Sequence, residues 1–184
     1  ALDFETNFVE GQSEWVVVEA DEYDRSFLHL SPNIAVVLSM DADHLDIYGD
    51  RASLHETGFR AFAKKLEPGS KLYLQHRWAA EMGNVPGLEL FGVEGGSYRA
   101  DHIRVEDGYF TFDYHSPAHR LEGLQLSLPG RHNVENATAA ITVALQLGGK
   151  GEDIRRALRS FRGIRRRFEF LHRSENRAYI DDYA

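Results

Sequence analysis

Two acidic clusters in the first fifty residues have the composition of a metal site. The first holds four carboxylates within six residues, namely Glu19, Asp21, Glu22 and Asp24. The second reads DADHLD and adds one imidazole, His44. Carboxylates this close together repel one another unless a cation or solvent separates them, and Mg²⁺ takes oxygen ligands from carboxylates and substrate phosphates. Either cluster alone is typical of solvated acids at a strand end, but the two together favour a divalent-cation site.

An arginine-rich segment further along the chain could bind phosphate. Residues 150–177 carry ten Lys and Arg against four Asp and Glu, whereas residues 1–149 carry eleven against twenty-three. Arg165, Arg166 and Arg167 are consecutive, and the planar guanidinium group suits the oxygens of a phosphate. A basic surface strand is the more common explanation of such a run. The acidic clusters and the arginines together suit a site that joins a metal ion to a phosphate.

A third segment has side chains that could bind the base of a nucleotide. The residues HNVEN, from His132 to Asn136, precede an alanine-rich stretch with helical periodicity. We expect Asn133 to cap that helix and Asn136 to lie about one turn later. The donor and acceptor of an asparagine amide match the edge of adenine, a pairing best established for DNA bases. From the spacing alone, an ordinary capped helix fits equally well.

The elements that must position these residues follow an α/β pattern. β-Branched apolar runs at 15–18 and 34–40 predict strands buried on both faces, and each runs directly into an acidic cluster. In an open α/β sheet, ligands bind beyond the carboxyl ends of the strands. Apolar residues recurring at helical spacing further predict helices at 59–66, 78–82, 134–145 and 152–161. Alternating apolar and polar residues predict antiparallel sheet from about 88 to 128. Further strands are predicted at 71–75, 167–171 and 178–181.

The composition is that of an ordinary globular domain and excludes several classes of protein. The chain has 184 residues, enough for one domain with a sizeable core, and 42% of them are hydrophobic. Because it has no cysteine, it has no disulfide framework, thiolate metal site or cysteine nucleophile. The net charge of −8 argues against nucleic-acid binding, and no apolar run approaches the ~18 residues of a membrane-spanning helix. We therefore expect a cytoplasmic protein that binds neither nucleic acid nor membrane.

Five motifs resemble, in the same order, those of the Mur ligases, the ATP-dependent amide-forming enzymes of peptidoglycan synthesis. They read VVVEADEYDRSF, DADHLDIYGD, LPGRHNVENATAA, RRRFEF and YIDDYA. The first two have the forms typical of the family members that join L-alanine to UDP-N-acetylmuramate. The resemblance covers nearly the whole chain and implies the family's central ATP-binding domain. Its fold is a mostly parallel α/β sheet flanked by helices, with a small antiparallel β subdomain.

The resemblance also implies roles for particular residues. Glu19 and His44 match the positions that hold magnesium ions near the phosphates of ATP. Arg167 matches the arginine that reaches the phosphates and acts in catalysis. The full set that matches the family's nucleotide-binding positions is His132, Asn133, Asn136, Arg167 and Asp182, with Asp182 near the ribose.

The resemblance implies that the chain is a fragment. Residues 1–177 would be the central domain without its first strand and phosphate-binding loop, because nothing in the chain matches G-x-x-x-x-G-K-[ST]. Residues 178–184 would begin the C-terminal domain or its linker. We expect ATP and Mg²⁺ as cofactors, UDP-N-acetylmuramate and L-alanine as substrates of the complete enzyme, and an acyl-phosphate intermediate. The isolated chain is expected to be inactive.

Two other functions are consistent with parts of the sequence. A metal-dependent phosphoesterase would also place Asp and His clusters at strand ends, but it would need several histidines near both clusters, and only His44 is there. A non-catalytic domain could use the basic 150–177 segment to bind nucleic acid or a partner, which would leave the acidic clusters without a role.

Overall fold

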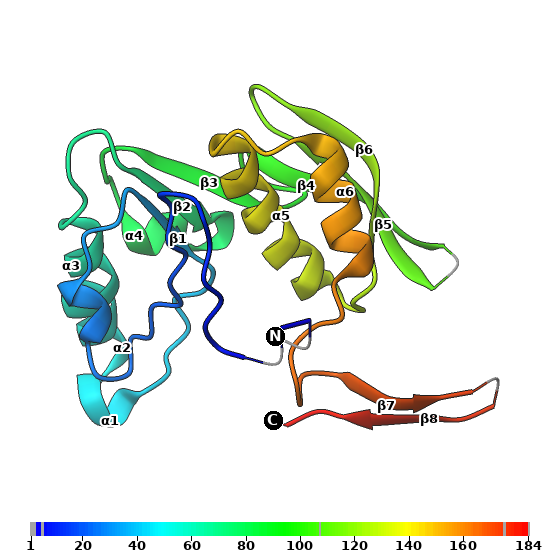
Figure 1. The fold of residues 1–184 in the computed structure, drawn as a ribbon. Helices are drawn as coiled ribbons and strands as arrows, with labels where there is room; N and C mark the ends of the chain where they lie inside the picture. Colours follow the sequence, from blue (N-terminus) through cyan, green and yellow to red (C-terminus); the bar gives the residue numbers. More distant parts are fainter. Residues whose placement is uncertain (1–2, 5, 107, 175, 184) are drawn as a thin grey trace.

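The fold is a mixed sheet covered by helices, with a separate hairpin near the C-terminal end (Figure 1). The computed structural model describes residues 3–4, 6–106, 108–174 and 176–183. The strands are β1 (Ile34–Val37), β2 (Lys71–Gln75), β3 (Leu88–Val93), β4 (Tyr98–Glu106), β5 (Tyr109–His115), β6 (Arg120–Leu126), β7 (Glu169–Arg173) and β8 (Ala178–Asp181). The helical segments are η1 (Ser26–His29), α1 (Leu45–Tyr48), α2 (Arg51–Ser53), η2 (Leu54–Phe59), α3 (Arg60–Ala63), η3 (His76–Trp78), α4 (Ala79–Met82), α5 (Arg131–Gln146) and α6 (Gly151–Ser160).

The six-stranded sheet follows the order of the chain from β1 to β6. The pairings from β1 to β4 are parallel and those from β4 to β6 are antiparallel, which confirms the mostly parallel α/β class. The antiparallel strands continue this sheet, and β7 and β8 form the small separate antiparallel pair. Antiparallel pairing was expected from about residue 88, but β3 is parallel to both of its neighbours.

The tight connection between β3 and β4 explains that difference. The chain turns back on itself within residues 94–97, where Glu94 and Gly96 both have positive φ angles. A Cβ atom at Gly96 would lie 2.5 Å from the carbonyl oxygen of Leu90, so the return depends on glycine. β4 therefore begins beside β3 and runs in the same direction.

The parallel part of the sheet is covered on both faces. On β2, Leu72 and Leu74 pack with the helical segments η2 and α3, whereas Tyr73 points to the other face and packs with Ala139 of α5. All three β2 side chains are fully buried. Alternation of side chains across a strand puts successive residues on opposite faces, so an apolar run such as this one requires helices on both sides.

The strand predicted at 15–18 does not form. Residues 14–20 have no regular secondary structure, and Val16 and Val17 are 82% and 90% exposed. A buried strand needs hydrogen-bonded neighbours and a cover on each face. Within the described part of the chain, β1 is the edge strand and pairs with β2, so residues 15–18 receive neither.

The helices lie where the hydrophobic periodicity predicts them, except that one of them begins earlier in the chain. α5 and α6 lie where helices were expected, and the N–H of Gly148 closes the end of α5 by donating to the Leu145 carbonyl. The helix expected at 59–66 begins earlier, at Arg51, and includes the π-helical segment η2. No helix in the described ranges is long and apolar enough to cross a membrane.

Candidate functional site

His44 is the N-cap residue of α1, at the end of the loop that follows the carboxyl end of β1. Its backbone is left-handed, with φ of 54°, and its N–H donates to Asp43 Oδ1 at 2.8 Å. Its carbonyl accepts from the N–H groups of Ile47 and Tyr48, at 2.9 and 3.3 Å, which starts the helix. The imidazole position is therefore set by the start of α1.

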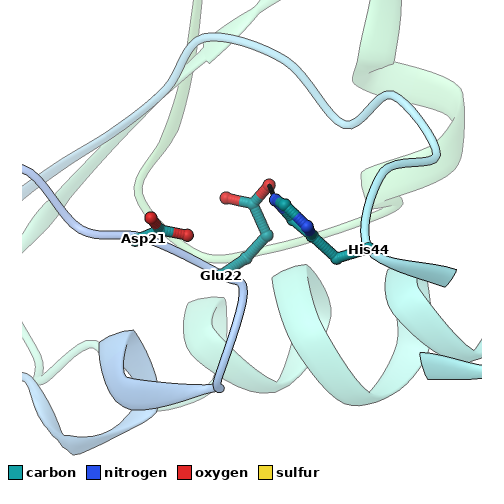
Figure 2. Close-up of side chains that lie close together, drawn as sticks. All are labelled: Asp21, Glu22 and His44. Carbon is teal, nitrogen blue, oxygen red and sulfur yellow. Dashed lines mark ion pairs between the residues drawn. The ribbon is translucent and has the colours of Figure 1, made fainter. Parts of the chain in front are cut away.

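The loop before η1 brings two carboxylates to this imidazole. Glu22 Oε1 lies 3.8 Å from His44 Nε2, with Asp21 beside it (Figure 2). Tyr48 of α1 donates its hydroxyl to the Glu22 carbonyl at 2.8 Å, and burial raises the pKa of Tyr48, so this hydroxyl stays protonated. The Tyr23 N–H donates to Asp21 Oδ1, and the Tyr23 ring contacts the His44 ring edge-on. These contacts fix the loop against α1.

The donor atoms of this group suit a divalent cation. Asp21, Glu22 and His44 each offer one ligand atom, and these atoms lie within 4.8 Å of one another. The side chains of Glu22 and His44 are 29% and 31% exposed, and Asp21 is exposed, so one side of the group is open to solvent. Mg²⁺ usually keeps several waters and binds one or two carboxylates together with substrate phosphates. An open group with two carboxylates fits that requirement.

The remaining carboxylates of the two clusters are placed differently. Glu19 lies in the exposed 14–20 segment, outside the Asp21–Glu22–His44 group, so its role as a metal ligand stays a prediction. Hydrogen bonds from the side chain and backbone of Ser26 lower the pKa of Asp24. Asp41 accepts a hydrogen bond from the hydroxyl of Ser39 at 2.5 Å. Asp24 and Asp41 are therefore engaged in hydrogen bonds with residues two positions away in the chain.

His55 contacts the loop that leads to His44 and was not identified from the sequence. It is 9% exposed on η2, and its Nε2 lies 2.8 Å from the Met40 carbonyl in the loop between β1 and His44. Its ring also lies edge-on to Phe59 and Trp78. Extending the helical stripe from Phe59 back by one turn would have placed His55 on the buried face.

The start of α5 lies at the same edge of the sheet. At the carboxyl end of β2, Gln75 Nε2 donates to Glu135 Oε1 at 2.6 Å, and Arg77 donates to Glu135 Oε2 at 3.0 Å. Beyond the carboxyl end of β3, Glu94 pairs with Arg131 at 3.2 Å. Because β1, β2 and β3 are parallel neighbours, α5 begins at the edge where His44 lies. Gln75 and Glu135 were not identified from the sequence.

The HNVEN segment forms the first turns of α5. The N-cap of α5 is Gly130, so the expectation that Asn133 caps the helix is wrong. Asn133 lies inside the first turn, and its Nδ2 donates to the Pro129 carbonyl at 2.6 Å, which joins the helix to the preceding loop. His132 and Asn136 are exposed. Two of the three expected adenine contacts are therefore open to solvent.

Arg167 and Asp182 lie near each other around the β7–β8 hairpin. Asp182 Oδ1 accepts from the backbone N–H of Phe168 at 3.2 Å, directly after Arg167. The Tyr183 N–H donates to the Arg166 carbonyl, and the Arg166 guanidinium lies over the Tyr183 ring. The side chain of Arg167 is exposed. In Figure 1 this hairpin and α1 lie at the lower edge of the view, on its right and left sides, and α5 begins above the hairpin, near the middle of the view.

Known proteins share this sequence and fold. A family model described as Mur ligase middle domain matches residues 3–144. The UDP-N-acetylmuramate–L-alanine ligase of Flavobacterium psychrophilum is 43% identical over 187 residues, covering 99% of this chain and 39% of the relative. Its namesake from Christiangramia forsetii is 42% identical over 182 residues, with the same coverage. The chain thus spans about two fifths of the length of these relatives.

Solved structures agree with the sequence matches. The UDP-N-acetylmuramate-alanine ligase MurC of Thermotoga maritima superposes with a TM-score of 0.74 at 27% identity, over 90% of this chain and 38% of that one. MurF of Acinetobacter baumannii superposes with a TM-score of 0.72 at 27% identity, over 87% of this chain and 36% of that one. Since the family model covers most of the chain and the fold agrees, the chain belongs to the Mur ligase family.

Proposed function

We propose that this chain is the metal- and nucleotide-binding part of an ATP-dependent ligase that joins L-alanine to UDP-N-acetylmuramate in peptidoglycan synthesis. The observation that carries the proposal is the 43% identity, over nearly the whole chain, to a relative whose name states this activity. The position of the Asp21–Glu22–His44 group and of α5 at one edge of the sheet supports it, because α/β sheets bind ligands there.

We assign residues 1–177 to the central ATP-binding domain and residues 178–184 to the start of the C-terminal domain or its linker. Residue 184 lies outside the described residues. β7 pairs with β8 across the proposed boundary, so the hairpin itself is the junction. The other parts of the complete protein supply the phosphate-binding loop and the site for the UDP-sugar.

The acidic loop and His44 are the donors for Mg²⁺ in this proposal. Asp21, Glu22 and His44 hold the ion, and Glu19 adds a carboxylate from the same segment. When bound, Mg²⁺ neutralises charge on the phosphate oxygens and aligns them for transfer. Arg167 offsets the negative charge that develops on the transferred phosphoryl group, because preorganised charge acts most strongly in the transition state.

The nucleotide lies along the start of α5 in the same proposal. His132 and Asn136 present exposed polar groups to adenine. Asn133 contributes its amide oxygen, because its Nδ2 is already used by the Pro129 carbonyl. Asp182 binds the ribose through the carboxylate oxygen that its bond to Phe168 leaves available.

The reaction proceeds in two steps. A carboxylate oxygen of UDP-N-acetylmuramate attacks the γ-phosphorus of ATP, the bond to the bridging oxygen breaks, and ADP leaves an acyl phosphate. The amine of L-alanine then attacks the acyl carbon, an amide forms, phosphate leaves and a proton passes from the nitrogen to solvent. We assign the reaction to the cytoplasm, because ATP is its phosphoryl donor.

The test uses the complete protein that contains this chain. Phosphate release from Mg·ATP should require both UDP-N-acetylmuramate and L-alanine. Hydroxylamine supplied in place of L-alanine should trap the acyl phosphate as a hydroxamate. The isolated 184-residue chain should show no turnover, since each missing charged element costs roughly 10²–10³-fold in rate.

A pair of matched variants distinguishes loss of the metal site from a general effect of removing a carboxylate charge. Glu22→Gln in the complete protein should lower kcat by roughly 10²-fold and raise the Mg²⁺ concentration needed for half-maximal rate. Glu122→Gln, which changes an exposed carboxylate on β6, should leave both unchanged. Phosphate release that does not depend on L-alanine, or full turnover by the isolated chain, would overturn the proposal.

A further inference from the structure

A second group of Asp and His side chains lies on the antiparallel strands, away from the site described above. Asp101 of β4 and Asp113 of β5 are directly opposite partners in the sheet. Like charges in such a pair repel, because their side chains are neighbours on one face. His115 lies two residues after Asp113, so both point to that face. The ligand atoms of these three residues lie within 4.8 Å of one another.

Two of the ligand atoms are buried without a hydrogen bond. Among the described residues, Asp101 Oδ1 and His115 Nε2 have no hydrogen-bond partner, although they lie 3.1 Å apart. Their side chains are only 19% and 18% exposed, and that of Asp113 is 14% exposed. Buried polar atoms normally have partners, and unpaired ones indicate a missing water, ion or ligand.

We propose that Asp101, Asp113 and His115 form a binding site for a divalent transition-metal ion of the Zn²⁺ type. In a tetrahedral zinc site with bonds of 2.0–2.1 Å, neighbouring ligand atoms are about 3.3 Å apart, and the two unpaired atoms are separated by 3.1 Å. Imidazole nitrogen and carboxylate oxygen are both Zn²⁺ ligands, and three protein ligands leave a fourth position for water. An ion there joins β4 to β5 and relieves the repulsion between the opposed carboxylates.

Surrounding groups hold the ligands in place. The N–H of Gly123 on β6 donates to Asp113 Oδ1 at 2.7 Å, and His102 Nδ1–H donates to Asp113 Oδ2 at 2.9 Å. His102 lies in a bulge of β4 with φ of 51°, which turns its ring toward the carboxylates. Arg99 Nε lies 3.3 Å from Asp101 Oδ2, whereas the other oxygen, Oδ1, has no hydrogen bond to any described residue and lies 3.6 Å from His102 Nδ1. Such outer partners orient ligands in metal sites.

The test titrates metal-free 184-residue chain carrying His44→Gln, which disables the other candidate group. Zn²⁺ should bind with one equivalent at micromolar concentrations and raise the Tm. Co²⁺ should give the visible absorption bands of a low-symmetry cobalt site. Excess Mg²⁺ should not displace Zn²⁺, because Mg²⁺ strongly prefers oxygen ligands.

Variants of the proposed ligands test whether these residues bind the Zn²⁺ ion. His115→Gln and Asp113→Asn, added separately, should weaken Zn²⁺ binding by about 100-fold or more, since even loss of an outer partner costs about 10–100-fold. His119→Gln, a control in the turn after β5, should bind as tightly as its parent. If a ligand variant fails to fold by circular dichroism, the His115 ring signals of the folded parent should still shift with Zn²⁺. Absence of one-equivalent binding in the parent, unchanged binding in a folded His115→Gln variant, or displacement by Mg²⁺ would overturn the proposal.

Discussion

Replacing Tyr48 by phenylalanine tests whether α1 holds the acidic loop in place. The substitution removes one hydroxyl, which donates to the Glu22 carbonyl at 2.8 Å, and keeps the buried ring and its contact with Arg25. A hydrogen bond of this kind contributes about 1 kcal/mol net, and water can reach the freed carbonyl because Glu22 is partly exposed. We therefore expect a loss of about 1 kcal/mol in the free energy of unfolding, or a Tm lower by about 2–4 °C.

The same loss should weaken cation binding. If the bond keeps Glu22 beside His44, 1 kcal/mol corresponds to about a fivefold higher Kd, since 1.4 kcal/mol is tenfold. Stability is measured by urea unfolding, and Mn²⁺ binding is followed by electron paramagnetic resonance in a His115→Gln background, which excludes the β4–β5 group. Tyr179→Phe, at a 60% exposed tyrosine of β8, is the matched control. The reasoning fails if Tyr48→Phe changes neither quantity, or if the control changes them equally.

Three further predictions concern other parts of the chain. In the complete enzyme, Asn136→Ala should raise the KM for ATP more than it lowers kcat, because a contact far from the reacting phosphorus stabilises the ground state and the transition state equally. Arg167→Ala should instead mainly lower kcat, because a charge near the transferred group acts most strongly in the transition state. Identical kinetic effects of the two variants would contradict the separate roles of Asn136 in binding adenine and of Arg167 in catalysis. His55→Leu should lower the free energy of unfolding, measured by urea titration, by about 1–3 kcal/mol, because the Met40 carbonyl loses its buried hydrogen-bond partner. An unchanged free energy of unfolding would contradict this role of His55. Burial raises the pKa of Tyr73 above its unfolded value of about 10, so the stability that this buried hydroxyl contributes is complete below pH ~10 and is lost as the pH rises further. Between pH 8 and 11 the Tm of Tyr73→Phe should therefore fall less steeply than the Tm of the parent protein. Parallel Tm curves for the two proteins would contradict a raised pKa of Tyr73.

The local pattern of the chain was sufficient for most elements. The strands expected at 71–75 and 178–181 have those bounds in the structure, and α5 and α6 lie within a few residues of their expected ranges. These elements could be read from the sequence because their periodicity matches the face that each buries, and because glycine marks the end of α5. The family motifs are also local, and the family match over residues 3–144 confirms the family that they indicate.

Pairing between distant residues could not be predicted in the same way. The run at 15–18 has the composition of a buried strand, but composition does not supply the neighbouring strand that would satisfy its backbone. The direction of β4 likewise depends on the conformation of Glu94 and Gly96, which the alternating pattern of β4 does not encode.

The sequence by itself determined the kinds of side chain available for chemistry, the order of the elements and the family. Only the tertiary structure decided which side chains meet. It brings Asp21 and Glu22 of the first acidic cluster to His44 and places His55 within hydrogen-bond distance of the Met40 carbonyl. It also gathers Asp101, Asp113 and His115 across β4 and β5. The physical reason is that such meetings depend on strand register, on bulges and on the direction of each loop, all of which are set by contacts between residues far apart in the chain.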